Sequence, residues 1–141
     1  MHRMEHHPRT VADFNDMSRG HLPGRLGIEI VSITGDEVKA RMSLTQTHLT
    51  PHGYLHAASV VALADSACGY GCIAGLPDGS GFTTIELKSN HLATQTSGSL
   101  ICVARRVHGG RTTQVWDAEV TGEDTGRRLA LFRCTQLLVS G

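Results

Sequence analysis

Hydrophobic and polar residues alternate along most of the chain, with one long apolar stretch near its middle. The alternation runs through residues 25–35 and 37–44 around a Gly-Asp turn, which predicts two strands joined in a tight hairpin. The apolar stretch, residues 55–76, predicts one long helix that ends at a glycine and a proline. Four more strand-like runs follow, separated by turn signals, at residues 81–92, 98–109, 111–122 and 127–139.

The order strand–strand–helix–four strands predicts an α+β fold in which one antiparallel sheet wraps around one central helix. A short helix is expected earlier in the chain, over residues 11–19, with Thr10 as its N-cap and Gly20 after its end. The first ten residues are polar and are expected to form a mobile arm. Residues 11–141 are then a single domain, because 141 residues suffice for one core.

Composition narrows the function classes. Lys plus Arg and Asp plus Glu both number 13, so no overall charge attracts nucleic acid or an anionic membrane. No signal-peptide pattern is present, and His52, His56 and Asp65 interrupt the apolar stretch too often for a bilayer span. Four scattered cysteines do not indicate a disulfide framework, so a cytoplasmic protein is expected.

A single carboxylate, Asp65, stands in the middle of the apolar helix. The helix has no polar face, so it is predicted to be buried on all sides. A buried carboxylate without a partner costs several kcal/mol, on the order of a whole protein's stability margin. Asp65 is therefore a candidate catalytic group; a structural hydrogen bond to a strand or across an interface is the alternative interpretation.

Helical geometry limits what Asp65 can do alone. His56 precedes it by nine positions, so the two side chains point to opposite faces and lie roughly 13 Å apart along the axis. The free N–H groups of the helix start, around Ala57, suit a carbonyl oxygen or an oxyanion. Asp65 is too distant to act on that same carbonyl within one subunit. A two-fold dimer with antiparallel helices predicts a site shared between subunits.

These residues resemble a known family. The stretch from Thr50 through His56-Ala57-Ala58 to Asp65 looks like the motif of the hotdog-fold acyl-CoA thioesterases of the PaaI and Arthrobacter-type 4-hydroxybenzoyl-CoA thioesterase group. The resemblance extends over residues 22–140. It implies a hotdog fold, hydrolysis of a medium-chain or aromatic acyl-CoA, and a homodimer with shared active sites that pairs into a homotetramer.

The resemblance also implies roles for single residues. Asp65 takes the position of the catalytic carboxylate, as nucleophile or general base. The Ala57 N–H takes the position that polarises the thioester carbonyl, and His56 holds the helix start. Thr83 falls near a strand position that orients water or the carbonyl. Thr50 stands where the family has Asn or Gln, and its hydroxyl has a shorter reach.

The hairpin over residues 105–113 is the candidate site for coenzyme A, which enters as part of the substrate and not as a cofactor. Arginine side chains and exposed N–H groups suit phosphates. The resemblance places nucleotide contacts at this turn, which favours Arg106, Arg111 and Thr112. An ordinary solvated turn is the alternative interpretation.

Other site types find little support in the sequence. The nine histidines lack the spacing of a metal site, so no metal is expected. No Gly-x-Ser-x-Gly motif is present, and the cysteines lie in apolar runs that raise the pKa of a thiol. Because Thr50 and Ala57-Ala58 depart from the family pattern, a non-catalytic acyl-CoA-binding hotdog protein remains the alternative function. A hotdog dehydratase is more distant, since no upstream histidine fits that pattern.

Overall fold

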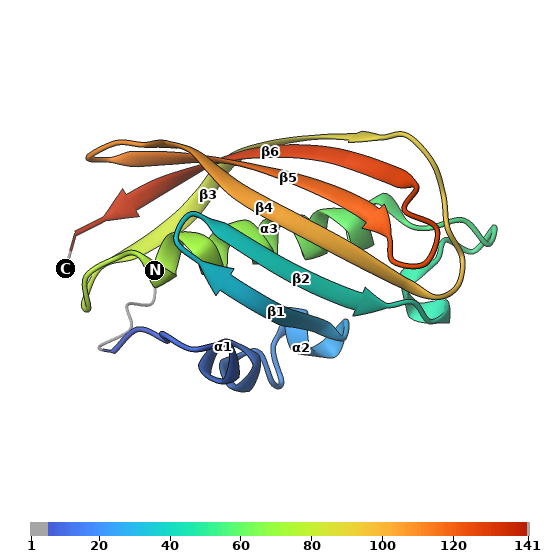
Figure 1. The fold of residues 1–141 in the computed structure, drawn as a ribbon, viewed down its shortest axis with the longest axis horizontal. Helices are drawn as coiled ribbons and strands as arrows, with labels where there is room; N and C mark the ends of the chain where they lie inside the picture. The colour runs from blue at the N-terminus through green and yellow to red at the C-terminus, as the bar shows by residue number, and fades with distance from the viewer. Residues whose placement is uncertain (1–5, 141) are drawn as a thin grey trace.

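One six-stranded antiparallel sheet curls around a long central helix in the computed structural model, which describes residues 6–140 (Figure 1). In chain order the elements are α1 (Val11–Met17), α2 (Leu22–Arg25), β1 (Ile28–Thr34), β2 (Glu37–Ser43), the short 3-10 helix η1 (Gln46–His48), α3 (Ala57–Ala74), β3 (Gly81–His91), β4 (Ser99–Gly109), β5 (Thr113–Gly122) and β6 (Arg128–Val139). All six strands and the long helix lie where the sequence pattern predicts them. The predicted α+β class is confirmed.

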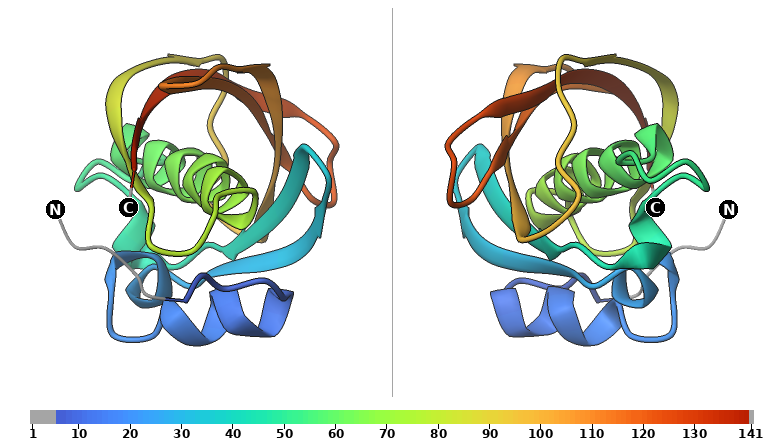
Figure 2. Two further views of the ribbon diagram at one scale, coloured as in Figure 1. Left: turned by 90° about the vertical axis from the view of Figure 1, so that its left-hand side faces the viewer. Right: turned by 90° about the vertical axis from the view of Figure 1, so that its right-hand side faces the viewer.

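The strand order is β1-β2-β4-β5-β6-β3, so β1 and β3 are the two edges. The β1–β2 hairpin turns at Gly35, whose φ of 57° is in the left-handed region that favours glycine. Viewed along α3, the sheet surrounds the helix on most sides (Figure 2). The edge strand β3 therefore lies beside α3 and can bring its side chains to the helix.

The core forms between the inner face of the sheet and α3. Every second residue of β5 is buried, as expected for a strand with one face on the core. The helix contributes small side chains at its closest approach to the sheet. At Gly71 a Cβ atom would lie 2.7 Å from Trp116 Cζ3 and 2.9 Å from Val38 Cγ2. Only glycine fits between these two buried side chains.

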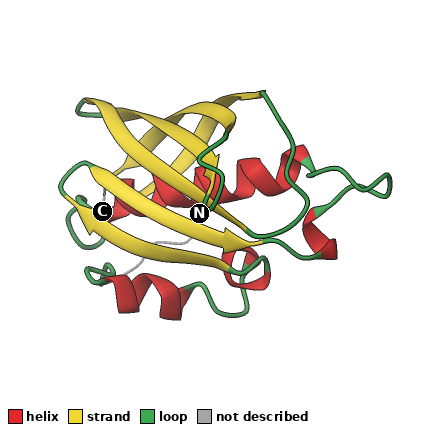
Figure 3. Cartoon of the chain, turned by 45° about the vertical axis from the view of Figure 1, so that its right-hand side comes forward, coloured by secondary structure: helices red, strands yellow, loops and turns green. Residues whose placement is uncertain are grey.

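The helices α1 and α2 lie along the β1 edge (Figure 3). Thr10 caps α1 as predicted, and Phe14 packs against Tyr70 of α3 with ring centroids 5.0 Å apart. Asn15 pairs with the free edge of β1: its amide donates to Ile30 O and accepts from Ile30 N–H. This contact covers an edge that would otherwise expose backbone groups. The sequence pattern did not predict α2, a single turn that begins at Leu22 and has Pro23 as its second residue.

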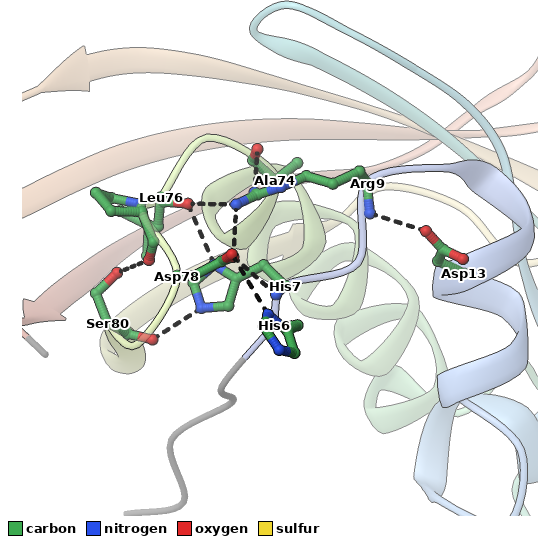
Figure 4. Close-up of polar contacts among 9 residues, drawn as sticks. His6, His7, Arg9, Asp13, Ala74, Leu76, Asp78 and Ser80 are labelled. Atoms are coloured by element: carbon green, nitrogen blue, oxygen red, sulfur yellow. Dashed lines mark hydrogen bonds and ion pairs between the residues drawn. The ribbon is translucent and has the colours of Figure 1, made fainter.

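Residues 6–10 lie against the end of α3 rather than extending from the domain (Figure 4). The His7 side chain is buried, and its two ring nitrogens lie 3.2 Å from Leu76 O and 2.9 Å from Ser80 O. Arg9 and the His7 backbone both bind the Asp78 carboxylate. The predicted mobile arm covered residues 1–10. Its first five residues lie outside the described part, and residues 6–10 make these contacts with the rest of the domain.

The sequence pattern predicted a central helix that is buried on all sides. In the structure, one side of α3 is only half-buried. A stripe of four half-buried residues runs along one face of α3: Val61, Ala62, Asp65 and Ser66. The sheet covers the other faces. By length and composition α3 could span a membrane, yet more than half of it is buried inside this fold, as in the core helix of a globular domain. The prediction fails because the sheet of one chain leaves this stripe uncovered.

Candidate active site

Asp65 lies in the middle of the uncovered stripe of α3. Its Oδ1 accepts a hydrogen bond from Thr84 Oγ1 of the neighbouring strand β3, at 2.9 Å. Burial raises the pKa of the Asp65 carboxyl, and the Thr84 hydrogen bond partly offsets that rise. Within residues 6–140 no Lys, Arg or His forms an ion pair with Asp65. A half-buried carboxylate with one hydroxyl partner can accept a proton readily.

The strand residue that hydrogen-bonds to Asp65 is Thr84, next to Thr83, which was predicted to orient water or the carbonyl. Side chains alternate between the two faces of a strand. Phe82 lies against α3 at Gly69, so Thr83 points to the outer face and Thr84 to the helix. The sequence could not distinguish the two adjacent threonines, because the choice depends on strand register. An irregularity of this strand follows directly: the pairing of β3 with β6 shifts by one residue between Thr84 and Glu86.

The start of α3 is capped by His56. Its Nδ1 accepts a hydrogen bond from the Ala58 N–H at 2.9 Å, which leaves the ring hydrogen on Nε2. The His56 carbonyl accepts from the Ser59 N–H at 3.0 Å. Among the described residues the Ala57 N–H has no hydrogen-bond partner, and Ala57 is exposed. The helix start therefore offers one free donor, from the residue that the sequence analysis selected.

The segment before α3 is anchored by His48, a residue that the sequence analysis missed. His48 Nδ1 accepts from the Thr45 N–H at 2.9 Å, and Nε2 lies 2.6 Å from Leu26 O. The His48 carbonyl then accepts from His56 N at 3.0 Å and from Ser59 Oγ at 2.9 Å. A threonine three residues before a histidine is the only sequence signal for this turn. His48 thus fixes the position at which α3 begins.

Thr50 lies in the same segment, where it closes a small loop. Its Oγ1 accepts a hydrogen bond from the Tyr54 N–H at 3.2 Å, and the two residues also share a backbone hydrogen bond of 2.7 Å. The hydroxyl hydrogen of Thr50 is not used in either contact. Thr50 can therefore still donate to a ligand, as its sequence position predicts.

Ala57 and Asp65 are too far apart to act on one carbonyl group. Eight residues of helix separate their Cα atoms by about 12 Å along the axis. A surface hollow of about 570 Å³ lies on the outer face of the sheet, between residues such as Val103, Leu131 and Arg133, and does not reach Asp65. One subunit therefore supplies the two parts of the site at separate places.

The predicted coenzyme A residues lie at or near the β4–β5 turn. Arg111 and Thr112 are exposed at its tip. Arg106 forms an ion pair with Asp36, at 2.7 Å between Nη2 and Oδ1, which holds its guanidinium over the β1–β2 turn. Arg111 has the freer side chain of the two arginines. The structure thus gathers these three residues in one region, apart from Asp65.

Gly69, one turn after Asp65, leaves no room for a side chain. A Cβ atom there would lie 2.8 Å from the ring of Phe82. Phe82 occupies the space in which a side chain next to Asp65 would lie, so Thr84 is the only hydroxyl that hydrogen-bonds to the carboxylate among the described residues.

The four cysteines are reduced and buried, and none lies in a setting that favours a thiolate. Burial raises the pKa of Cys72 and Cys102 to about 12. A hydrogen bond with Cys134, together with burial, raises the pKa of Cys68. No group of three potential metal ligands occurs within residues 6–140. Asp65 is thus the ionisable side chain best placed for chemistry near α3.

Known proteins that are similar to this chain include thioesterases and acyl-CoA hydrolases. Residues 52–128 match the thioesterase superfamily. A 1,4-dihydroxy-2-naphthoyl-CoA hydrolase from Listeria monocytogenes is 34% identical over 114 residues, which cover 81% of this chain and 92% of that protein. The enzyme of the same name from Escherichia coli is 30% identical over 133 residues, or 92% of this chain and 95% of that protein. A crystal structure of a mutant of the thioesterase PA1618 from Pseudomonas aeruginosa matches with a TM-score of 0.88 and 28% identity, over 92% of this chain and 93% of that one. The chain therefore belongs to the thioesterase superfamily and is a thioester hydrolase with the hotdog fold.

Proposed function

We propose that this protein hydrolyses a medium-chain or aromatic acyl-CoA to the free acid and coenzyme A. The observation that carries the proposal is Asp65, a half-buried carboxylate without an ionic partner among the described residues, beside one hydroxyl donor. Two similar proteins are named as hydrolases of an aromatic acyl-CoA, which supports the aromatic substrate class. The reaction needs no cofactor, because coenzyme A is part of the substrate.

Asp65 acts on the thioester in one of two ways. As a general base, the carboxylate removes a proton from water while the water oxygen bonds to the carbonyl carbon. The carbon–sulfur bond then breaks, and the proton passes to the departing thiolate. As a nucleophile, a carboxylate oxygen attacks the carbonyl carbon and expels the thiolate, and water then hydrolyses the anhydride. In both routes the carbonyl oxygen gains negative charge, which an N–H donor stabilises.

That donor is the Ala57 N–H of the partner subunit in the proposed dimer. The stripe of α3 that contains Asp65 is uncovered in one chain, and the neighbouring edge strand β3 exposes Ile85 and Leu87. A second copy on this side covers both and brings its own helix start toward Asp65. His56 holds the donor in place. We further propose that two such dimers form a tetramer.

The β4–β5 turn supplies the proposed contacts to the coenzyme A portion. Arg111 and Thr112 are exposed there, and an arginine fork fits a phosphate group. Arg106 contributes less in this scheme, because Asp36 already neutralises part of its charge. The Thr50 hydroxyl lies in the segment before the start of α3, where it donates to the substrate.

A shared site predicts complementation between two inactive variants. Ala57→Pro removes the N–H at the first helical position, where proline is well tolerated, and the extended backbone of His56 is compatible with a following proline. Mixed with Asp65→Asn subunits at equal amounts, it is expected to restore about a quarter of wild-type turnover, because half of the dimers carry one intact site. The measurement is thiol release after subunit exchange. No recovery beyond the two separate variants would contradict a shared site.

A panel of acyl-CoA substrates tests the proposed function. Thiol release is expected from aromatic or medium-chain members at rates well above those of short-chain members. The expected preference follows from the small residues along α3, such as Ala62 and Ser66, which leave room beside Asp65. If CoA esters bind, as measured by calorimetry, but none is hydrolysed, the protein is instead an acyl-CoA-binding member of the family.

A further inference from the structure

A row of polar side chains crosses the inner face of the sheet and ends at Asp65. In the strand registers, Gln114 of β5 lies opposite Gln136 of β6, which lies opposite Thr84 of β3. Gln136 has no exposed surface at all. A buried glutamine in a core strand is uncommon, and a buried polar group needs hydrogen-bond partners. The row therefore indicates a role for Gln136 beyond packing.

The hydrogens in this row restrict how it can be arranged. Thr84 Oγ1 lies 2.9 Å from Asp65 Oδ1 and 2.9 Å from Gln136 Oε1. A hydroxyl has one hydrogen, so it donates to only one of these oxygens and must accept from the other group. The chain of two hydrogen bonds thus runs either from Asp65 to Gln136 or from Gln136 to Asp65.

The proton on Asp65 decides the direction. When Asp65 is protonated, its O–H donates to Thr84, and Thr84 donates to Gln136 Oε1. Gln136 Nε2 then lies 3.5 Å from Cys134 Sγ. When Asp65 is ionised, Thr84 donates to the carboxylate, and the amide must turn over so that Nε2 donates to Thr84. The amide oxygen then faces the Cys134 thiol, which can donate an S–H. In both arrangements the Asp65 carboxyl, the Thr84 hydroxyl and the Gln136 amide each have a hydrogen-bond partner.

We propose that Thr84 and Gln136 are positioning residues whose hydrogen-bond chain reverses with the proton on Asp65, keeping the carboxyl bonded in both of its states. The proposal rests on the proposed role of Asp65 in hydrolysis. A general base is ionised before it takes the proton from water and neutral until that proton reaches the thiolate. The buried Gln136 amide has only to turn over between the two states, and this rotation leaves the volume of the side chain unchanged.

The other titratable groups near Asp65 on α3, β6 and β3 do not fill this role. It falls to the hydrogen-bonded pair Thr84 and Gln136, which we call the relay. On its own helix, Asp65 is followed one turn later by Cys68, whose raised pKa keeps it neutral. On β6, the Cys134 thiol lies behind Gln136. On β3, Glu86 and Lys88 pair with outward-facing residues of β6 and point away from the helix. No charged group therefore faces Asp65 from these three elements.

Two substitutions in the relay are expected to move the acid limb of the pH profile of kcat/KM in opposite directions. This limb is the low-pH side of the profile, where activity falls as Asp65 takes up a proton. Thr84→Val removes the only hydrogen-bond donor to the carboxylate among residues 6–140, so ionisation of Asp65 becomes harder and the limb moves to higher pH. Gln136→Met removes the amide from both states. In the neutral state it leaves the Thr84 hydrogen without its acceptor, whereas in the ionised state it leaves only a lone pair of Thr84 unfilled and Thr84 still donates to the carboxylate, so the limb moves to lower pH. Each shift is expected to be about one pH unit, the size of one hydrogen bond to a charged group.

Controls separate the relay from a general effect on packing. Thr84→Ser retains the hydroxyl and should restore the wild-type limb. Gln114→Met makes the same change in the neighbouring buried glutamine, whose Oε1 accepts from Trp116 instead, and should leave the limb in place. Melting temperatures of all variants report stability separately. Limbs that stay in place, or that move in the same direction in both relay variants, would overturn the relay.

A second readout does not need turnover. The ¹³C resonance of the Asp65 carboxyl, identified by its absence in Asp65→Asn, reports ionisation directly, and its midpoint should shift as the limbs do. Unchanged midpoints in both relay variants would overturn the relay even in an active enzyme. Full activity of Asp65→Asn would instead contradict the proposed function, whatever the midpoints show. The two failures are therefore distinguishable.

Discussion

Replacing Asp65 with asparagine is expected to lower acyl-CoA hydrolysis by at least about 100-fold while the protein stays folded. General acid–base groups contribute a factor of this order or more. Asparagine has nearly the same size, and its amide can still accept from Thr84 Oγ1, so the packing around α3 is preserved. What is lost is a group that can take a proton or attack a carbonyl carbon. The measurement is thiol release from the best substrate, with the oligomeric state checked by light scattering.

The matched control is Asp16→Asn, the same chemical change on α1. Asp16 is exposed and forms only a surface ion pair with Arg19, at 3.5 Å, which contributes little to stability. Its turnover should equal that of the wild type. Turnover in Asp65→Asn close to that of this control would remove Asp65 from the mechanism and leave the hydrogen bond to Thr84 as its sole role.

Replacing Gly71 with alanine is expected to destabilise the fold by about 1–3 kcal/mol. An added methyl group would overlap with Trp116 and Val38, both fully or almost fully buried, so neither can move into free space. For a domain of this size that loss lowers the melting temperature by several degrees, roughly 3–10 °C. Thermal unfolding followed by circular dichroism measures it.

Gly75→Ala is the control for the same change in the same helix. Gly75 ends α3 with a φ of −96°, which alanine adopts without strain, and a Cβ atom there meets nothing closer than 3.9 Å. It should leave stability unchanged or raise it slightly, because alanine restricts the unfolded chain. Equal melting temperatures for the two variants would show that the helix can move away from Trp116.

The sequence predicted most of the secondary structure because its signals are local. Alternation identified the strands, and the long apolar stretch identified α3. The predicted helix began at residue 55, whereas α3 begins at Ala57, since His56 serves as its cap. The helix α2 was missed because a single turn has too few residues for a periodic pattern.

The candidate site was predicted in part. Asp65 and the helix start at Ala57 follow from hydrophobic pattern and helical spacing, and the structure gives each a setting that fits its predicted role. These roles stay predictions until the variants are measured. Thr84, Gln136 and His48 were not found, because each acts through a partner that is distant in the sequence. The choice between Thr83 and Thr84 depends on which face of β3 meets α3.

The sequence by itself determined the elements, their order and the one carboxylate in the apolar helix, because periodicity and composition act over a few residues. Only the tertiary structure decided which hydroxyl reaches Asp65 and which glutamine lies behind that hydroxyl, because strand register pairs residues as far apart in the sequence as Thr84 and Gln136. It also showed that one chain leaves a face of α3 uncovered. That open face results from how far a six-stranded sheet can wrap around one helix, which no local pattern records.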